Sequence, residues 1–306
     1  MILVGGEALY DLVLQRSHDD LVGHPGGGPF NTARTIGRLE QPVAYLGRLS
    51  RDHFGERMLG ILREDGVDLG AVVETDDPTT LALAEVDDDG VARYRFYERG
   101  TSAVGLDADA ALAALPGDVR ILHVGTLGLM LEPVATALEA VVERLAPSAL
   151  IAVDPNIRPW AIGDGDGYRA RLARVLGRSH VVKVSQEDLA WLYPGVPEVE
   201  AVRTLLELGP VLGLLTRGPN GAVVVTRTAE VAVPAPRAKV VDTIGAGDAF
   251  GGGFLAWWSE RGLTREDLGT IDLAVEATAF ACLVAARTCA RPGAEPPYRS
   301  ELPSSG

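Results

Sequence analysis

The sequence contains few cysteines and fewer basic than acidic residues. Cys282 and Cys289 are the only thiols among 306 residues, so the sequence has neither a disulfide framework nor the cysteine spacing of a zinc site. This usage is typical of a reducing compartment, and we expect a cytoplasmic protein. The 28 lysines and arginines against 42 aspartates and glutamates give a formal net charge of −14. Nucleic acids and anionic membranes attract basic proteins, so neither is an expected partner, although a locally positive site could still bind a small phosphate ligand.

Several common functional motifs are also missing. No apolar run approaches the roughly 20 residues of a membrane helix, and the opening MILVGGEALYD lacks the basic stretch of a signal peptide. The sequence has no GxxxxGK followed by Ser or Thr, no GxGxxG after its first apolar run, and no HExxH. These absences exclude a P-loop enzyme, argue against a dinucleotide-dependent dehydrogenase, and exclude a zinc protease of the HExxH type.

The sequence does contain an alternation of short apolar runs with longer amphipathic ones. Residues 2–6 indicate a buried strand, and residues 29–39 indicate a helix with Pro29 in its first turn. The pattern predicts a single α/β domain covering 1–306, with a mostly parallel sheet flanked by helices on both faces. Further strands are predicted at 43–49, 119–125, 149–156, 180–185 and 211–218, and further helices at 54–67, 133–146, 168–178 and 199–209.

Residues 8–24 and 72–99 break this alternation. Both show the period of a β-strand without intervening helices, and the acidic run at 87–90 is suited to a hairpin turn. We expect these regions to form a small antiparallel sheet inserted into the α/β domain, placed as a lid beside a cleft. The alternative is that this sheet has no functional role.

The segment VVDTIGAGDAFGGGFLAWW, residues 240–258, combines two acids and several glycines with an apolar, helix-like run. The N–H groups of Gly245, Ala246 and Gly247 would lie at a helix N-terminus, where an anion is stabilised. Asp248 beside them could accept the proton of a substrate hydroxyl, which suggests a general base next to an anion hole. The alternative is that Asp248 only caps the helix.

Three stretches together resemble the ribokinase-like (PfkB) carbohydrate kinases. DTIGAGDAFGGGF at 242–254 is similar to the family's C-terminal signature. GHPGGGPFNTARTIGRL at 23–39 and LGRLSRDHFGERMLGILREDGVD at 46–68 are similar to its N-terminal signature. The resemblance covers nearly the whole chain and implies a ribokinase-like three-layer sandwich with a small β lid. It also implies that the carboxylate and the glycine-rich turn described above are the catalytic base and the anion hole.

The same resemblance implies where a sugar would bind. Asp11, from GGEALYD, could accept two hydrogen bonds from hydroxyl groups, as sugar recognition needs. VDPNIRPW at 153–160 is similar to a segment of the fructokinase and 2-keto-3-deoxygluconate kinase branch. Arg158 in this segment would contact the substrate or a phosphate, and a surface ion pair is the alternative. The implied sugar-binding residues also include Gly26, Gly27 and Asn31.

For the second substrate and the ions, the resemblance implies ATP, Mg²⁺ and, as an option, a monovalent cation such as K⁺. VVKVSQEDLAWL at 181–192 is similar to a family motif whose glutamate organises magnesium and its waters. Asp188 stands in place of that glutamate, Glu187 is adjacent, and Asp242 is a further acid implied to lie near the cations. The usual asparagine of the adenine helix is absent, and Cys282 lies near its place. The implied ATP-binding residues are Lys183, Ser185, Thr216, Gly218, Gly221 and Cys282.

The choice of sugar depends on YRFYERGTSAVGL at 94–106, which is similar to a stretch of fructokinase-like members. Tyr97 and Arg99 are candidates for sugar contact, and packing within the lid is the alternative for Tyr97. Glu98 would repel an acid sugar if it faced the cleft, whereas Arg99 would attract one, because neighbours on a strand point to opposite faces. We expect fructose first, with 2-keto-3-deoxygluconate, ribose and nucleosides as alternatives.

The residues and the resemblance together predict a carbohydrate kinase that uses ATP to phosphorylate a primary hydroxyl of a sugar. The apolar outer face expected for the lid would need a cover, so we expect a homodimer formed through the lids. The alternative from another class is a sugar- or nucleotide-binding regulatory protein without turnover. Only the altered magnesium motif at 185–188 favours that alternative.

Overall fold

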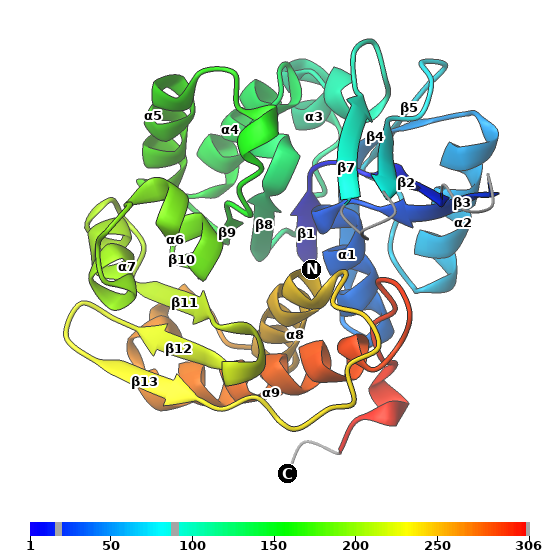
Figure 1. Cartoon of the computed structure of the whole chain (residues 1–306). Coiled ribbons are helices and arrows are strands. Elements are labelled where there is room, and N and C mark those ends of the chain that lie inside the picture. Colours follow the sequence, from blue (N-terminus) through cyan, green and yellow to red (C-terminus); the bar gives the residue numbers. More distant parts are fainter. Residues whose placement is uncertain (16–19, 87–91, 304–306) are drawn as a thin grey trace.

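The computed structural model describes residues 1–15, 20–86 and 92–303. The main sheet within these residues has nine strands: β1 (Ile2–Gly5), β4 (Val43–Ser50), β5 (Val72–Thr75), β8 (Ile121–Gly125), β9 (Leu150–Asp154), β10 (Val181–Ser185), β11 (Leu212–Thr216), β12 (Ala222–Val225) and β13 (Glu230–Val233). Their order is β13-β12-β11-β10-β9-β8-β1-β4-β5 (Figure 1). The strands from β11 to β5 pair parallel, whereas β12 and β13 pair antiparallel. The mostly parallel sheet is therefore confirmed.

Helices cover both faces of this sheet, because successive side chains of a buried strand point to opposite sides. In β1, Leu3 packs into one apolar cluster, while Ile2 and Val4 pack into another. The first cluster includes residues of α3 (Ala108–Ala113), α4 (Val134–Leu145), α5 (Gly165–Leu176), α6 (Gln186–Leu192) and α7 (Glu198–Glu207). The second includes residues of α1 (Gly28–Arg38), α2 (His53–Glu64), α8 (Ala246–Glu260) and α9 (Ile271–Cys289). The three predicted layers are visible in Figure 1. No helix in the described part of the chain is long and apolar enough to span a bilayer.

A second, smaller sheet is formed by β2 (Leu9–Gln15), β3 (Asp20–Gly26), β6 (Leu81–Val86) and β7 (Ala92–Tyr97), in the order β3-β2-β6-β7. β2 pairs antiparallel with β3, and β6 with β7, as expected of the lid, whereas β2 and β6 pair parallel. The sheet stands beside α2 (Figure 1). At this contact Tyr10 packs on Phe54 of α2, with ring centroids 4.6 Å apart. The turn expected at 87–90 lies outside the described residues.

Residues 72–75 are a correction to the expected lid. They form β5, which pairs parallel with β4 at the edge of the main sheet, and they do not belong to the small sheet. A short edge strand has the same alternation of side chains in either sheet. The pattern could therefore show that 72–75 is a strand, but not which sheet it joins.

Asp52 links the α/β body to the small sheet. Its carboxylate caps α2 by accepting the Gly55 N–H at 2.9 Å. The same carboxylate accepts the N–H and the hydroxyl of Thr79 at 2.8 and 2.7 Å. The hydroxyls of Thr80, just before β6, and Thr101, just after β7, share a hydrogen bond of 2.7 Å. The segments leading into β6 and out of β7 are therefore fastened to each other and to the body.

Candidate active site

The carboxyl ends of neighbouring parallel strands gather the candidate residues, as expected for an open α/β sheet. Thr126 follows β8, and Asn156 lies just beyond β9. The first turns of α1 and α8 meet them there. A Cβ on Gly28 would lie 2.6 Å from Thr126 Cγ2, 3.5 Å from Asn156 Nδ2 and 3.3 Å from Asp248 Oδ1. These four residues therefore border one small space.

Asp248 is buried in the first turn of α8, with 9% of its surface exposed. Its Oδ2 accepts a hydrogen bond from Asn31 Nδ2 at 2.9 Å, which joins α8 to α1. Gly245 occupies the N-cap position, and no side chain caps this helix. The carboxylate of Asp248 is therefore not used as a cap and is directed at Asn31 instead.

The turn before α8 presents backbone donors beside that carboxylate. Gly245 adopts a φ of +74°, in the left-handed region that glycine occupies at least cost. The Ala246 N–H, which was predicted to belong to the anion hole, is instead bonded to the Thr243 carbonyl at 3.2 Å. Gly247 and Asp248 follow in the first helical turn, where N–H groups have no intrahelical acceptor. The N–H groups of Gly247 and Asp248 and the positive end of α8 can therefore receive an anion.

Lys183 places a positive charge under this turn. Its Nζ donates to Asp154 Oδ2 at 2.7 Å, and both side chains are buried. A Cβ on Gly247 would lie 3.1 Å from Lys183 Nζ, so the ammonium lies directly against the turn. Burial raises the pKa of Asp154 to about 6, although Lys183 opposes this. Asp154 Oδ1 is buried without a hydrogen-bond partner in the described residues.

Burial also raises the pKa of Asp248. The Asn31 hydrogen bond and the positive charges of Lys183 and Arg158 act in the opposite direction, and burial outweighs them. A base accepts a proton most effectively when its pKa approaches the working pH. The environment of Asp248 therefore suits a general base better than an exposed aspartate would.

Asp11 of β2 lies against the glycines that precede α1. A Cβ on Gly26 would come within 2.3 Å of Asp11 Oδ2. Gly27 adopts a φ of +108°, and its Cβ would lie 2.6 Å from a backbone carbonyl oxygen. Burial raises the pKa of Asp11 to about 6, Arg158 opposes the rise, and Asp248 adds to it. Asp11 and Arg158 are therefore close enough to Asp248 for their charges to influence one another.

Arg158 lies just before η3 (Pro159–Ala161) and is exposed. Its Nη1 donates to Asn156 Oδ1 at 2.7 Å and to the Asn156 carbonyl at 3.1 Å. The described part of the chain contains no salt bridge of Arg158, which was the alternative for this residue. The guanidinium is thus held beside Asn156, with capacity for a further anionic group.

Glu7 was not singled out from the sequence. It is buried, its Oε1 accepts a hydrogen bond from the Thr126 hydroxyl, and its Oε2 accepts the Gly128 N–H at 3.0 Å. Burial raises the pKa of Glu7 to about 7, and Asp248 adds to the rise. Glu7 therefore fixes η2 (Thr126–Leu129), the turn that borders Asp248. An acid directly after a buried strand was the only sequence signal for it.

The acids expected to organise a metal ion are not brought together. Asp188 Oδ1 accepts the Ile157 N–H at 2.6 Å, and Oδ2 accepts the N–H and hydroxyl of Ser185 at 2.8 Å each. Asp188 and Ser185 thereby form a capping box at the start of α6. Glu187 is exposed on that helix, and Asp242 binds the N–H groups of Ile244 and Gly293. No group of three potential metal ligands occurs in the described residues.

The predicted ATP contacts differ in their surroundings. Thr216 ends β11 and donates to the Val184 carbonyl at 3.3 Å. Gly218 and Gly221 both adopt a positive φ between β11 and β12, and a Cβ on Gly221 would lie 2.1 Å from the Val233 carbonyl oxygen. The close approach of β13 is therefore enough to explain why residue 221 is a glycine, without any contact with ATP.

Cys282 is a correction, because its side chain is buried among the apolar residues around α8 and α9, which raises the pKa of the thiol to about 11.

Tyr97 is a second correction. Ala82 pairs with Asp11 on one side and with Phe96 on the other, so Phe96 shares the face of Asp11. Phe96 stacks on Trp160 of η3, with centroids 3.4 Å apart and planes 11° apart. Tyr97 pairs with Leu81 on the opposite face and is 49% exposed. Strand alternation therefore turns Phe96, rather than the predicted Tyr97, to the side of Asp11.

Arg99 lies beyond the end of β7 in an exposed turn. Because Arg99 is not part of the strand, strand alternation does not determine the direction of its side chain. Its contact with a sugar stays a prediction.

The arrangement matches known proteins over almost its whole length. Residues 1–300 match the family model described as pfkB family carbohydrate kinase. A fructokinase of Rhizobium leguminosarum bv. trifolii is 36% identical over 279 residues, which cover 89% of this chain and 84% of that protein. The crystal structure of a fructokinase with bound ATP from Xylella fastidiosa has a TM-score of 0.87 and 29% identity, covering 96% of this chain and 93% of the other. A Vibrio cholerae O395 fructokinase with fructose, ADP and calcium bound has a TM-score of 0.84 and 26% identity, covering 96% and 94%.

We expect Asp248→Asn to be more stable than the wild type, with a difference that grows as the pH rises. A carboxyl whose pKa is raised by folding stabilises the folded state while it is protonated. That contribution is lost as the pH rises through the folded pKa, whereas an amide carries no charge at any pH. Urea unfolding at about pH 5 and about pH 8 measures the difference.

Asp242→Asn is a control of opposite sign. Burial alone would raise the pKa of Asp242, but hydrogen bonds from the N–H groups of Ile244 and Gly293 outweigh it and lower the pKa. Removing this charge should therefore destabilise the protein at pH values above the ordinary pKa of an aspartate. If both variants shift stability in the same direction, the interpretation of Asp248 as a buried charge is wrong.

Proposed function

This chain belongs to the pfkB family of carbohydrate kinases, and we propose that it transfers the γ-phosphoryl group of ATP to a primary hydroxyl of fructose. The observation that carries the proposal is the buried carboxylate of Asp248, held by Asn31 beside the backbone donors of Gly247 and the ammonium of Lys183. A proton acceptor and an anion-binding turn thus lie at one point. The similarity to proteins named fructokinase supports fructose as the acceptor.

In the proposed reaction, Asp248 removes the proton of the hydroxyl, and the resulting oxygen attacks the γ-phosphorus. The bond from that phosphorus to the bridging oxygen breaks, and ADP leaves with its electron pair. The N–H groups at the start of α8 and Lys183 stabilise the negative charge of the transferring group. Asp248 then carries the proton until it is released to solvent.

Mg²⁺ would neutralise the phosphate oxygens when it arrives with the nucleotide. Magnesium usually keeps several waters and takes only one or two carboxylates besides the substrate phosphates. The free Oδ1 of Asp154 fits such a role through water, because it is buried and unpartnered near Lys183. Asp188 contributes through its hydrogen bonds to Ile157 and Ser185, which hold the segments around the site.

For the sugar, we propose that Asp11 accepts hydrogen bonds from its hydroxyl groups and that the amide of Asn31 donates hydrogen bonds to them. Gly26 and Gly27 keep that side of the cleft free of side chains. Phe96 forms the wall contributed by the small sheet, which acts as a lid that excludes water. Arg158 is the group that would favour an acid sugar such as 2-keto-3-deoxygluconate, because it lies exposed near Asp11.

The first test is ATP-dependent release of ADP with fructose, 2-keto-3-deoxygluconate, ribose, glucose, tagatose, adenosine or no sugar. We expect turnover with fructose, and a loss of about 10²- to 10⁴-fold in kcat for Asp248→Asn, because the general base is removed. Turnover with keto-deoxygluconate alone would contradict fructose and assign Arg158 to a carboxylate. ATP binding without turnover on any sugar would favour a regulatory binding protein.

Phe96→Ala should weaken sugar binding more than Tyr97→Ala. Loss of an aromatic wall stacked on Trp160 is expected to raise the KM for fructose by about tenfold. Tyr97 points to the other face of the sheet, so its removal should leave that KM nearly unchanged. Steady-state kinetics at saturating ATP give both values. Equal effects of the two substitutions would refute the assignment of the faces.

We also propose that the lids pair two copies of the chain. Leu83 and Tyr97 lie on the lid face opposite Asp11, with Leu83 half-buried and Tyr97 exposed. Light scattering after size exclusion should show a dimer for the wild type and a monomer for Leu83→Lys, which also places a second cation beside Arg95. Leu112→Lys, at an exposed leucine of α3, should leave the dimer intact. A monomeric wild type would rule out the lid interface.

A further inference from the structure

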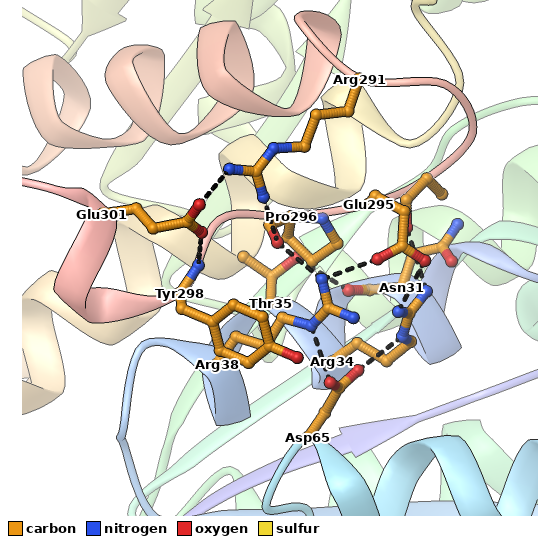
Figure 2. A network of polar contacts seen from close by, with 11 residues as sticks. Asn31, Arg34, Thr35, Arg38, Asp65, Arg291, Glu295, Pro296, Tyr298 and Glu301 are labelled. Carbon is orange, nitrogen blue, oxygen red and sulfur yellow. Dashed lines mark hydrogen bonds and ion pairs between the residues drawn. The ribbon is translucent and has the colours of Figure 1, made fainter.

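Helix α1 carries two buried arginines, Arg34 about one turn and Arg38 about two turns beyond Asn31. Arg34 Nε and Arg38 Nε donate to the two oxygens of one carboxylate, Asp65, at 2.7 Å each (Figure 2). Arg34, Arg38 and Asp65 are 3%, 9% and 4% exposed. Two cations around one anion leave an uncompensated positive charge, which is costly at a buried position. A second carboxylate is therefore needed here.

Glu295 supplies that second carboxylate from the other end of the chain. Its Oε1 lies 3.0 Å from Arg34 Nη2, and its Oε2 lies 2.7 Å from Arg38 Nη1. The two arginines, Asp65 and Glu295 form a closed square of two positive and two negative charges (Figure 2). The side chain of Glu295 is 46% exposed, whereas the other three members of the square are buried, so Glu295 is the member on the solvent side.

The same arginines hold the backbone around Glu295. Arg34 Nη1 donates to the Ala294 carbonyl at 3.0 Å, and Arg38 Nη1 donates to the Pro296 carbonyl at 2.8 Å. We call residues 291–301 the C-terminal strap. Its middle is thus bound to α1 through both side chain and backbone, as Figure 2 shows.

The strap lies against the anion-binding turn. A Cβ on Gly245 would come within 2.6 Å of Ala294 Cβ, and the Gly293 N–H donates to Asp242 Oδ2 at 2.9 Å. The turn is therefore backed by the two strap residues that precede Glu295. Displacing them would remove a packing surface from Gly245 and a hydrogen bond from Asp242.

We propose that Glu295 is a positioning residue for phosphoryl transfer. By closing the charge square with Arg34 and Arg38, it holds the strap under the turn at 242–247. Asn31 of the same helix holds Asp248, so α1 contacts both the proposed base and the strap behind the anion-binding turn. The proposal rests on the proposed kinase function. Glu295 itself touches no part of the reacting groups and acts only through the strap.

Removing Glu295 would leave one positive charge of the buried arginines uncompensated, so we also expect some loss of stability. Stability alone therefore does not test the positioning role. A displacement of about 1 Å in a catalytic group, in contrast, can lower the rate about 10²-fold. The positioning role of Glu295 should therefore be found in the kcat of the folded variant, with sugar affinity nearly unchanged.

The test compares Glu295→Ala and Glu295→Gln with Glu301→Ala. Glu301 is on the same strap, is similarly exposed, and also pairs with an arginine, Arg291, but it does not contact α1 through that pair. We expect Glu295→Ala to lower kcat about tenfold or more with the KM for fructose nearly unchanged. The kcat of Glu295→Gln should lie between those of the wild type and Glu295→Ala, because the amide oxygen can still accept a hydrogen bond from one arginine. Glu301→Ala should keep the wild-type kcat.

Hydrogen exchange of the amides at 240–248 gives a second readout that needs no turnover. Exchange there should be faster in Glu295→Ala than in the wild type and unchanged in Glu301→Ala. If the wild type phosphorylates no sugar, the kinase proposal fails, and the exchange result alone still decides whether Glu295 positions the turn. Unchanged kcat and exchange in Glu295→Ala, or equal changes in Glu301→Ala, would overturn the inference.

Discussion

The hydrogen bond from Asn31 to Asp248 joins the first turns of α1 and α8, and the rest of the cleft is arranged around it. A carboxylate buried without a donor would be costly, so the position of Asp248 depends on the donor that α1 supplies. The same helix begins at glycines that lie against Asp11 and Thr126. Small displacements of α1 would therefore alter the surroundings of Asp248, the proposed base, and of Asp11, the proposed sugar ligand, together.

The electrostatics of the candidate site follow from crowding buried and partly buried carboxyl groups together. Burial raises the pKa of each of them, and among the described residues the cations that oppose the rise are Lys183 and Arg158. Groups with strongly shifted pKa values gather at functional sites because charge interactions are stronger there than in water. The carboxyl groups concerned are Glu7, Asp11, Asp154 and Asp248.

In the small sheet, a shift of one position along a strand changes which side chain is assigned to the sugar. The aromatic pair at 96–97 offers two similar rings to opposite faces, and the pairing of Ala82 with Asp11 and Phe96 decides which ring meets the cleft. Residues 72–75 show the same limit at a larger scale, because the strand was recognisable and its sheet was not. Asp188 is similar, since an acid three residues after a serine can cap a helix or approach a metal ion.

The sequence by itself determined the alternation of strands and helices, the turn from Gly245 to Asp248, and the glycines before α1. These features depend on neighbouring residues, whose dihedral angles and first-turn hydrogen bonds are set locally. Only the tertiary structure decided the contacts between distant segments. The Thr126 hydroxyl meets Glu7 across 119 positions, and Arg34 meets Glu295 across 261. No periodicity relates such residues, because their proximity results from the order of strands in the sheet and from the packing of α1 against the chain's last segment.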